Sequence, residues 1–320
     1  MNVLFVSATR VGDAVLSMGL LDRLVQDHPG ARVTVACGPA AAPLFDAVPG
    51  LDRVIVLDKM VLSLHWLALW SACVGRRWDV LVDLRNAPIT WLLSARRRLR
   101  FVGRHNGVHR VRQLAAVLGL DDDPPAPVLW LDDAHRQWAA EWIPDGAPVL
   151  AVAPTANWRA KIWPAERFAE LARRLTAADG ILPGGRIAVF GGADERPLAM
   201  AMLEAIPDEQ RIDLVGRPDL LSASACLGRC AFYIGNDSGL MHVAAASGVP
   251  TLGLFGPSPD ALYAPWGPLT AVVRTKESYE NIFPPAFDHR NAATLMEGLS
   301  VDMAEEAARA LWSRTLGVAV

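Results

Sequence analysis

Residues 233–250 have the sequence YIGNDSGLMHVAAASGVP, which carries the clearest signature of a fold in this chain. An apolar run typical of a buried strand ends in a polar glycine loop, and the loop leads directly into small residues typical of a helix. In an open α/β sheet such a loop lies at the carboxyl edge of the strands, where ligands bind. Backbone N–H groups at Ser238 and Gly239 would form a seat for an anion. Asp237 is able to accept hydrogen bonds from ligand hydroxyls, whereas His242 either faces the ligand or packs in the core.

The same alternation of strand and helix extends outward along the whole chain. Residues 14–28 have apolar side chains at helical spacing, and a last helical pattern covers residues 301–316. The alternation predicts parallel sheets with crossover helices, and the near-continuous apolar strands indicate sheets that are covered on both faces. The predicted strands are Val3–Ser7, Arg32–Ala36, Arg53–Leu57, Asp79–Leu84, Val149–Ala153, Arg186–Phe190, Arg211–Val215, Ala231–Ile234 and Thr251–Phe255.

A turn-rich segment, IPDGAP at residues 143–148, separates the two halves of the pattern. We therefore predict two Rossmann-like α/β domains, residues 1–145 and residues 146–320. The last helix belongs to the second domain or packs back on the first.

Composition excludes several classes of protein. With 20% charged and 52% hydrophobic residues, the 320-residue chain is able to bury a sizeable core. The formal net charge of −3 gives no reason to expect nucleic-acid binding. The N-terminus lacks a basic lead, and no apolar run is long enough to span a bilayer. The four cysteines lack a zinc-site pattern and are expected to be buried thiols, so we expect a cytoplasmic protein.

The first loop with residues suited to ligand binding or catalysis is SATRVGD, residues 7–13, which follows the first predicted strand. It lacks the G-x-G-x-x-G fingerprint of a nicotinamide site. Gly12 permits a ligand to approach the backbone, and Asp13 stands at the start of a helix. Asp13 is therefore either a functional carboxylate or only a helix cap.

A second loop, APTANWRAKIWP at residues 153–164, follows the first strand of the second half. Pro164 begins a helical pattern, so Lys161 would offer an ammonium group beside the positive end of a helix. The alternative is an ordinary solvated lysine.

These segments together resemble glycosyltransferase family 9, the heptosyltransferase-like enzymes of bacterial lipopolysaccharide assembly. The resemblance rests on the Gly12-Asp13 loop, the Lys161-Ile162-Trp163-Pro164 box, residues 237–242 (DSGLMH) and the continuation through residues 248–258. It implies a GT-B fold, with two Rossmann-like domains facing a central cleft, the acceptor mainly on the first and the donor mainly on the second. It also implies an inverting transfer, typically from ADP-heptose.

The resemblance implies a role for individual residues of this sequence. Asp13 would be the general base for the acceptor hydroxyl, and Lys161 would stabilise the departing diphosphate, with help from the Ser238 and Gly239 amides. The remaining donor contacts would be Thr155, Asp237, His242 and either Asp194 or Glu195. No cofactor beyond the nucleotide-diphosphate sugar substrate is expected. The acidic run at residues 121–123 precedes two prolines and is expected in a solvated loop, so we predict no metal site there.

From Leu84 to Leu120 the chain has eight arginines and no Asp or Glu. Such a surface is either simply solvated or suited to bidentate capture of phosphate and carboxylate groups of an anionic glycolipid acceptor. Just upstream, residues 64–70 (LHWLALW) form either a buried helix or a peripheral contact with the cytoplasmic face of the inner membrane. The candidate acceptor-binding residues are Arg10, Arg96, Arg97, Arg98 and Arg104.

Two other functions stay open. A sugar-nucleotide epimerase of the same architecture would leave the arginine cluster without a role. A non-catalytic nucleotide- or glycan-binding relative would leave Asp13 and Lys161 without one. Residues 156–160 (ANWRA) lack the acidic residues that some heptosyltransferases have there, so the sugar of the donor also stays open.

Overall fold

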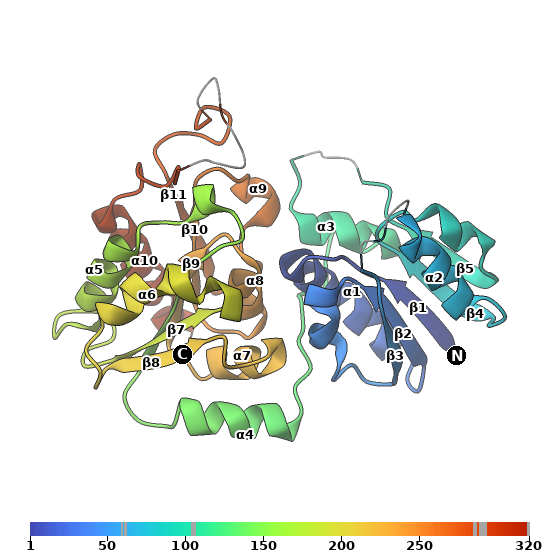
Figure 1. The fold of residues 1–320 in the computed structure, drawn as a ribbon, viewed down its shortest axis with the longest axis horizontal. Helices are drawn as coiled ribbons and strands as arrows, with labels where there is room; N and C mark the ends of the chain where they lie inside the picture. The colour runs from blue at the N-terminus through green and yellow to red at the C-terminus, as the bar shows by residue number, and fades with distance from the viewer. Residues whose placement is uncertain (59, 61–62, 104–106, 284–286, 288–292, 319–320) are drawn as a thin grey trace. The chain divides into compact units, whose positions relative to one another are not determined.

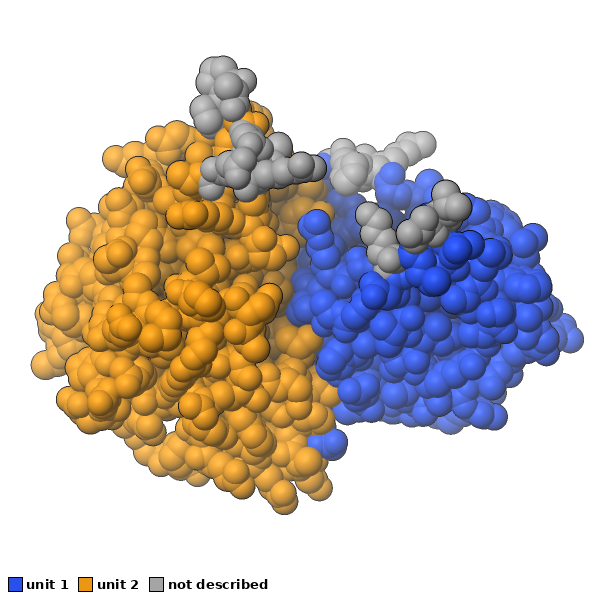
Figure 2. Space-filling model, viewed as in Figure 1, with its two compact units in different colours: residues 1–132 blue, residues 133–320 orange. Residues whose placement is uncertain are grey.

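The computed structural model describes residues 1–58, 60, 63–103, 107–283, 287 and 293–318. The chain divides into two compact units, residues 1–132 and 133–320 (Figure 2). Each unit contains one sheet in which the neighbouring strands run parallel. The division precedes the turn-rich segment at residues 143–148, so helix α4 (Asp133–Trp142) groups with the second unit. The α/β class and the two-domain organisation predicted from the sequence are confirmed.

The first unit is built on a sheet with the strand order β3-β2-β1-β4-β5 (Figure 1). Its core strand β1 is buried from Val3 to Val6, as expected for a strand that is covered on both faces. The described elements are β1 (Asn2–Val6), α1 (Val11–Asp27), β2 (Arg32–Cys37), η1 (Pro39–Phe45), β3 (Leu51–Val56), α2 (His65–Cys73), β4 (Trp78–Asp83), η3 (Pro88–Leu92), β5 (Ala95–Arg100), α3 (Arg110–Ala115) and η4 (Ala116–Leu118).

The second unit has a sheet with the order β11-β10-β9-β6-β7-β8. Strands β6, β9 and β10 are buried along their whole length. After α4, the described elements are β6 (Val149–Ala153), η5 (Arg159–Lys161), α5 (Ala165–Thr176), β7 (Arg186–Gly191), η6 (Ala193–Glu195), α6 (Arg196–Glu204), β8 (Arg211–Val215), α7 (Leu220–Leu227), β9 (Phe232–Asn236), α8 (Gly239–Ala246), β10 (Thr251–Phe255), α9 (Asp260–Tyr263), β11 (Thr270–Arg274) and α10 (Val301–Val318).

The four cysteines are buried free thiols, as predicted. Burial raises the pKa of Cys37 to about 12 and that of Cys73 to about 11, so both stay protonated at neutral pH. None of the described helices is long and apolar enough to cross a membrane.

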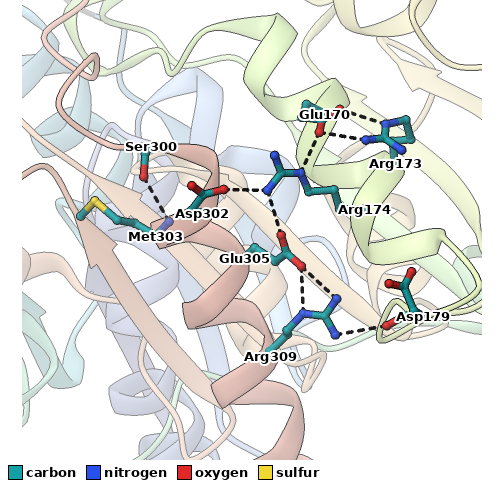
Figure 3. Close-up of polar contacts among 9 residues, drawn as sticks. All are labelled: Glu170, Arg173, Arg174, Asp179, Ser300, Asp302, Met303, Glu305 and Arg309. Atoms are coloured by element: carbon teal, nitrogen blue, oxygen red, sulfur yellow. Dashed lines mark hydrogen bonds and ion pairs between the residues drawn. The ribbon is translucent and has the colours of Figure 1, made fainter.

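The last helix, α10, packs against α5, β10 and β11 of its own unit. Its apolar face contributes Ala304, Ala308 and Leu311 to the core of that unit. A network of ion pairs joins the polar faces of α5 and α10 (Figure 3). The Nε atom of Arg174 contacts Glu170 at 2.7 Å, and its Nη1 atom contacts both Asp302 at 2.7 Å and Glu305 at 3.1 Å. One arginine thus connects carboxylates from both helices.

This network predicts a loss of stability in acid. Hydrogen bonds from Arg173 and Arg174 lower the pKa of Glu170 to about 2, and Arg174 also lowers the pKa of Glu305. Because these pKa values are lower in the folded than in the unfolded state (about 4.3), the stabilisation is present at neutral pH and is lost as the pH falls from about 5 towards 2. We expect R174A to lower the melting temperature by a few degrees at pH 7 and by less at pH 3, where part of the network is already protonated.

The measurement is thermal unfolding of the wild type and R174A at both pH values. Arg23→Ala is the matched control, since it removes only an exposed pair within α1, between Arg23 and Asp27. An R174A effect that is equal at both pH values would contradict the prediction.

Candidate functional site

In the second unit, Lys161 and Asp237 lie together at the carboxyl edge of the sheet. Lys161 ends η5 in the loop after β6, and Asp237 follows β9, the strand that pairs with β6. The Nζ atom of Lys161 lies 2.5 Å from Oδ2 of Asp237. The Asp237 side chain is 8% exposed and that of Lys161 is 22% exposed, so the ammonium group is the more accessible member of the pair. The sequence predicted both residues at this edge but not their ion pair.

Helix α8 begins directly beside this pair. Ser238 is its N-cap residue and makes no side-chain cap hydrogen bond, and Gly239 is its first residue. The first amides of a helix have no partner within the helix, and the helix dipole is positive at this end. The Lys161 ammonium group and these amides therefore suit a diphosphate in this position. His242, one turn further on, is buried.

A second carboxylate comes from η6, the turn that follows β7, the strand beside β6. The Oε2 atom of Glu195 accepts hydrogen bonds from the Thr155 hydroxyl and from the Gly192 amide, both at 2.8 Å. Glu195 is thus half-buried and linked to Thr155, whereas Asp194 is exposed. This geometry favours Glu195 over Asp194 as the acidic residue that faces a bound donor.

In the first unit, a pocket of about 220 Å³ contains Asp13. Asp13 lies in the first turn of α1, but the N-cap residue is Arg10, so Asp13 does not cap the helix. Within the described part of the chain, its carboxylate makes no hydrogen bond or ion pair. The residues that line the pocket are Ala8, Thr9, Arg10, Asp13, Ser17, Leu84, Arg85, Arg110 and Leu114.

The loop that carries the pocket packs tightly against the end of β2. The amide of Gly38 donates a hydrogen bond to the carbonyl of Ala8 at 3.2 Å. A Cβ atom on Gly38 would lie 2.6 Å from the Cα atom of Thr9, so any side chain there would displace the loop. This close approach holds the segment that leads into Asp13.

Two arginines give the pocket a positive wall. The guanidinium of Arg85 lies 4.7 Å from the Trp66 ring centroid, and that of Arg110 lies 4.3 Å from the Phe101 ring centroid. The buried Nη1 of Arg85 and Nε of Arg110 have no hydrogen-bond partner among the described residues. Burial lowers the pKa of Arg85, although nearby Asp83 opposes this shift. Guanidinium donors without partners, in a pocket that three arginines line, suit an anionic ligand.

Buried Asp83, at the end of β4, orients the loop that contains Arg85. Its carboxylate accepts hydrogen bonds from the amides of Arg85 and Ala87 and from the Thr90 hydroxyl, at 2.8 to 3.0 Å. Arg100, opposite Asp83 in the β4–β5 register, lies 3.6 Å away.

The other predicted acceptor residues lie elsewhere in the unit. Arg96 and Arg97 are exposed on β5, an edge strand, and do not line the pocket. Arg98 donates to the Leu93 carbonyl at 2.6 Å and lies over the Trp91 ring. Only Arg10 of the predicted set lines the pocket, and Arg104 lies outside the described residues.

No group of His, Cys, Asp and Glu side chains with the arrangement of a metal site occurs in the described parts of the chain. The run Asp121–Asp123 is exposed, in a loop. The backbone carbonyl of Asp121 accepts a hydrogen bond from Arg112 at 2.9 Å.

Comparisons with known proteins show the family and the fold of this chain. Residues 50–283 match the model of glycosyltransferase family 9 (heptosyltransferase). The chain is 30% identical to lipopolysaccharide heptosyltransferase 1 of Pseudomonas aeruginosa, in an alignment 313 positions long that covers 83% of this chain and 82% of that protein. The crystal structure of a family 9 glycosyltransferase from Veillonella parvula has a TM-score of 0.77 at 21% identity and covers 98% of this chain and 97% of its own. The structure of E. coli ADP-heptose lps heptosyltransferase II has a TM-score of 0.73 at 22% identity, with coverage of 98% and 99%. Both units therefore share their fold with solved glycosyltransferases of this type.

Proposed function

Because this chain belongs to glycosyltransferase family 9, the heptosyltransferase family, we propose that it transfers heptose from ADP-heptose to a lipopolysaccharide-core-type acceptor with inversion at the anomeric carbon. The observation that carries the proposal is the convergence of Lys161, Asp237 and the start of α8 at one sheet edge. One of the structural relatives is the E. coli ADP-heptose lps heptosyltransferase II, which supports ADP-heptose as the donor.

On the donor side, the diphosphate would lie at the N-terminus of α8, within reach of Lys161. Negative charge grows on the leaving phosphate as the glycosidic bond breaks, and fixed donors stabilise that charge without reorganisation. Asp237 and Glu195 would accept hydrogen bonds from hydroxyl groups of the donor. Thr155 would act through its bond to Glu195.

Asp13 is the proposed general base. The acceptor hydroxyl oxygen attacks the anomeric carbon on the face opposite to the diphosphate, and its proton passes to the Asp13 carboxylate. The bond from the anomeric carbon to the phosphate oxygen breaks, and ADP leaves with that electron pair. Since the carboxylate has no partner in the described part of the pocket, it is available as a proton acceptor.

Arg10, Arg85 and Arg110 would bind acidic groups of the acceptor next to Asp13. Arginine suits phosphate and carboxylate equally, because its planar fork matches both groups. This assignment moves the acceptor site from Arg96 and Arg97 on β5 to the arginines that line the pocket.

A peripheral contact with the membrane is part of the proposal, since the acceptor is a glycolipid. Helix α2 buries His65, Leu69 and Cys73 but exposes Leu67, and its N-cap residue Leu64 is exposed as well. The adjoining turn η3 exposes Trp91 and Leu92, at 61% and 68%. Exposed apolar side chains near the basic strand β5 suit an anionic lipid surface.

The test is calorimetric titration of the purified protein with ADP, UDP and GDP and then with their sugar conjugates. We expect saturable binding of ADP, with UDP and GDP at least about tenfold weaker, which corresponds to about 1.4 kcal/mol. Because Lys161 and the α8 amides stabilise the leaving group, we also expect transfer from ADP-heptose to persist in EDTA.

The other outcomes lead to the alternative functions. A preference for UDP, with conversion of a UDP-sugar in the absence of acceptor, would favour a sugar-nucleotide epimerase. Folded protein that binds none of the nucleotides would favour a non-catalytic relative.

A further inference from the structure

The loop between β6 and α5 carries Lys161 but has little regular structure of its own. Apart from the single turn η5, residues 154–164 form no helix or strand. A lysine ammonium group sits on a flexible four-carbon stem, so its position depends on how the loop beneath it is held. The contacts that hold this loop therefore bear on the chemistry of the site.

Asn236, the last residue of β9, bridges the two ends of this loop. Its Oδ1 atom accepts a hydrogen bond from the amide of Trp163 at 3.0 Å, and its Nδ2 atom donates to the carbonyl of Thr155 at 3.5 Å. The residue is fully buried. A carboxamide is able to accept one bond and donate another from the same planar group, which a carboxylate or an alkyl side chain is not.

The residue that follows holds the lysine itself. The amide of Asp237 donates to the carbonyl of Leu254 on β10 at 3.2 Å, which fixes its backbone to the sheet. Its carboxylate contacts the Lys161 ammonium group. Two consecutive residues at the end of β9 thus hold the loop at its ends and the lysine at its tip.

We propose that Asn236 is a positioning residue for the transfer reaction, which acts by fixing the Lys161 ammonium group at the start of α8. This inference rests on the proposed function, because it requires Lys161 to stabilise the departing diphosphate. Asn236 itself does not contact the substrate. Its effect on catalysis passes through the loop, and so through Lys161.

A purely structural role for Asn236 makes a different prediction. Other bonds also hold the loop, including those from the Leu295 amide to the Ala160 carbonyl at 3.0 Å and from Trp163 Nε1 to the Leu299 carbonyl at 2.9 Å. The loop therefore stays attached when Asn236 is truncated, and the unit is expected to fold. A structural residue would lower stability without any energetic coupling to Lys161, whereas a positioning residue is coupled to it.

The experiment is a double-mutant cycle of N236A and K161A, with transfer from ADP-heptose and thermal unfolding measured for each variant. We expect N236A to lower kcat by about 10²-fold, the effect of a misplacement of about 1 Å, with a smaller change in the KM for the donor. In the K161A background the same substitution should change kcat by no more than about twofold, because the group it positions is already gone.

Thr251→Val is the matched control, since Thr251 is equally buried on the adjacent strand β10 and its side-chain hydroxyl donates to the carbonyl of Val249, outside the loop. It should leave kcat within about twofold of the wild type. If N236A does not fold, N236D carries the cycle, because it keeps the acceptor for Trp163 but loses the donor to Thr155.

Each outcome is decisive. Folded N236A with wild-type kcat, or an N236A effect of full size in the K161A background, would overturn the positioning role while leaving the proposed function intact. Transfer that is unchanged in K161A would instead overturn the role of Lys161 and the proposal that rests on it.

Discussion

Replacement of Asp13 by Asn is expected to abolish transfer while leaving the binding of ADP unchanged. Asparagine is nearly isosteric with aspartate, so the pocket keeps its shape, but a carboxamide does not take a proton from the acceptor hydroxyl. General base catalysis contributes about 10² to 10⁴-fold to such reactions, and we expect a loss of kcat of about 10³-fold or more. The ADP affinity should be unaffected, because the proposed diphosphate site belongs to the second unit.

The measurements are initial rates with ADP-heptose and acceptor, and calorimetric titration with ADP. Asp27→Asn is the matched control: Asp27 lies at the far end of the same helix, where it pairs with Arg23 on the surface, and it does not line the pocket. D27N should retain wild-type activity. If D13N keeps kcat within about tenfold of the wild type, another group accepts the proton and Asp13 has been wrongly assigned.

The positions of most strands could be predicted from the sequence, because strands that are buried in a sheet have a recognisable pattern of apolar residues. Strands β6, β8 and β10 have the bounds that were predicted from the sequence. Strand β5 was not predicted, since ARRRLR has none of the apolar alternation of a buried strand. As an edge strand, β5 pairs only with β4, and its arginines extend to solvent or lie over Trp91. Edge strands commonly carry such charges, which is why the hydrophobic pattern that identified the other strands missed β5.

The sequence motifs indicated residues of the candidate site, but they did not indicate which side chains form an ion pair or share a pocket. Lys161 and Asp237 were both selected from sequence, yet their ion pair joins residues 76 positions apart and depends on β6 and β9 being neighbours. For the same reason, the sequence did not indicate which of the eight arginines between Leu84 and Leu120 line the Asp13 pocket. Arg85 lies there because it follows β4, the strand beside β1. The strand order, which no local pattern encodes, therefore determines which arginines line the proposed acceptor pocket.

Removal of the Lys161 ammonium group is the second substitution with a large expected effect. In K161A we expect kcat to fall by about 10² to 10³-fold, the usual cost of losing one fixed donor to a developing charge. The ADP affinity should fall as well, by about tenfold or more, since in the proposed site the same group would contact the ground-state diphosphate. Lys276→Ala, which removes an exposed lysine from the same unit, is the control and should change neither quantity.

The Lys161–Asp237 pair adds a sharper expectation. In K161A the largely buried Asp237 carboxylate loses its counter-charge and repels the diphosphate, so part of the lost ADP affinity comes from this repulsion. The double variant K161A/D237N should therefore bind ADP several-fold more tightly than K161A alone, although it lacks one more polar contact. ADP is the right probe, because it lacks the transferred sugar, whose hydroxyl groups Asp237 would bind. Double-variant affinity equal to or below that of K161A would show that the carboxylate does not face the diphosphate. Unchanged ADP binding and transfer in K161A would remove Lys161 from the donor site altogether.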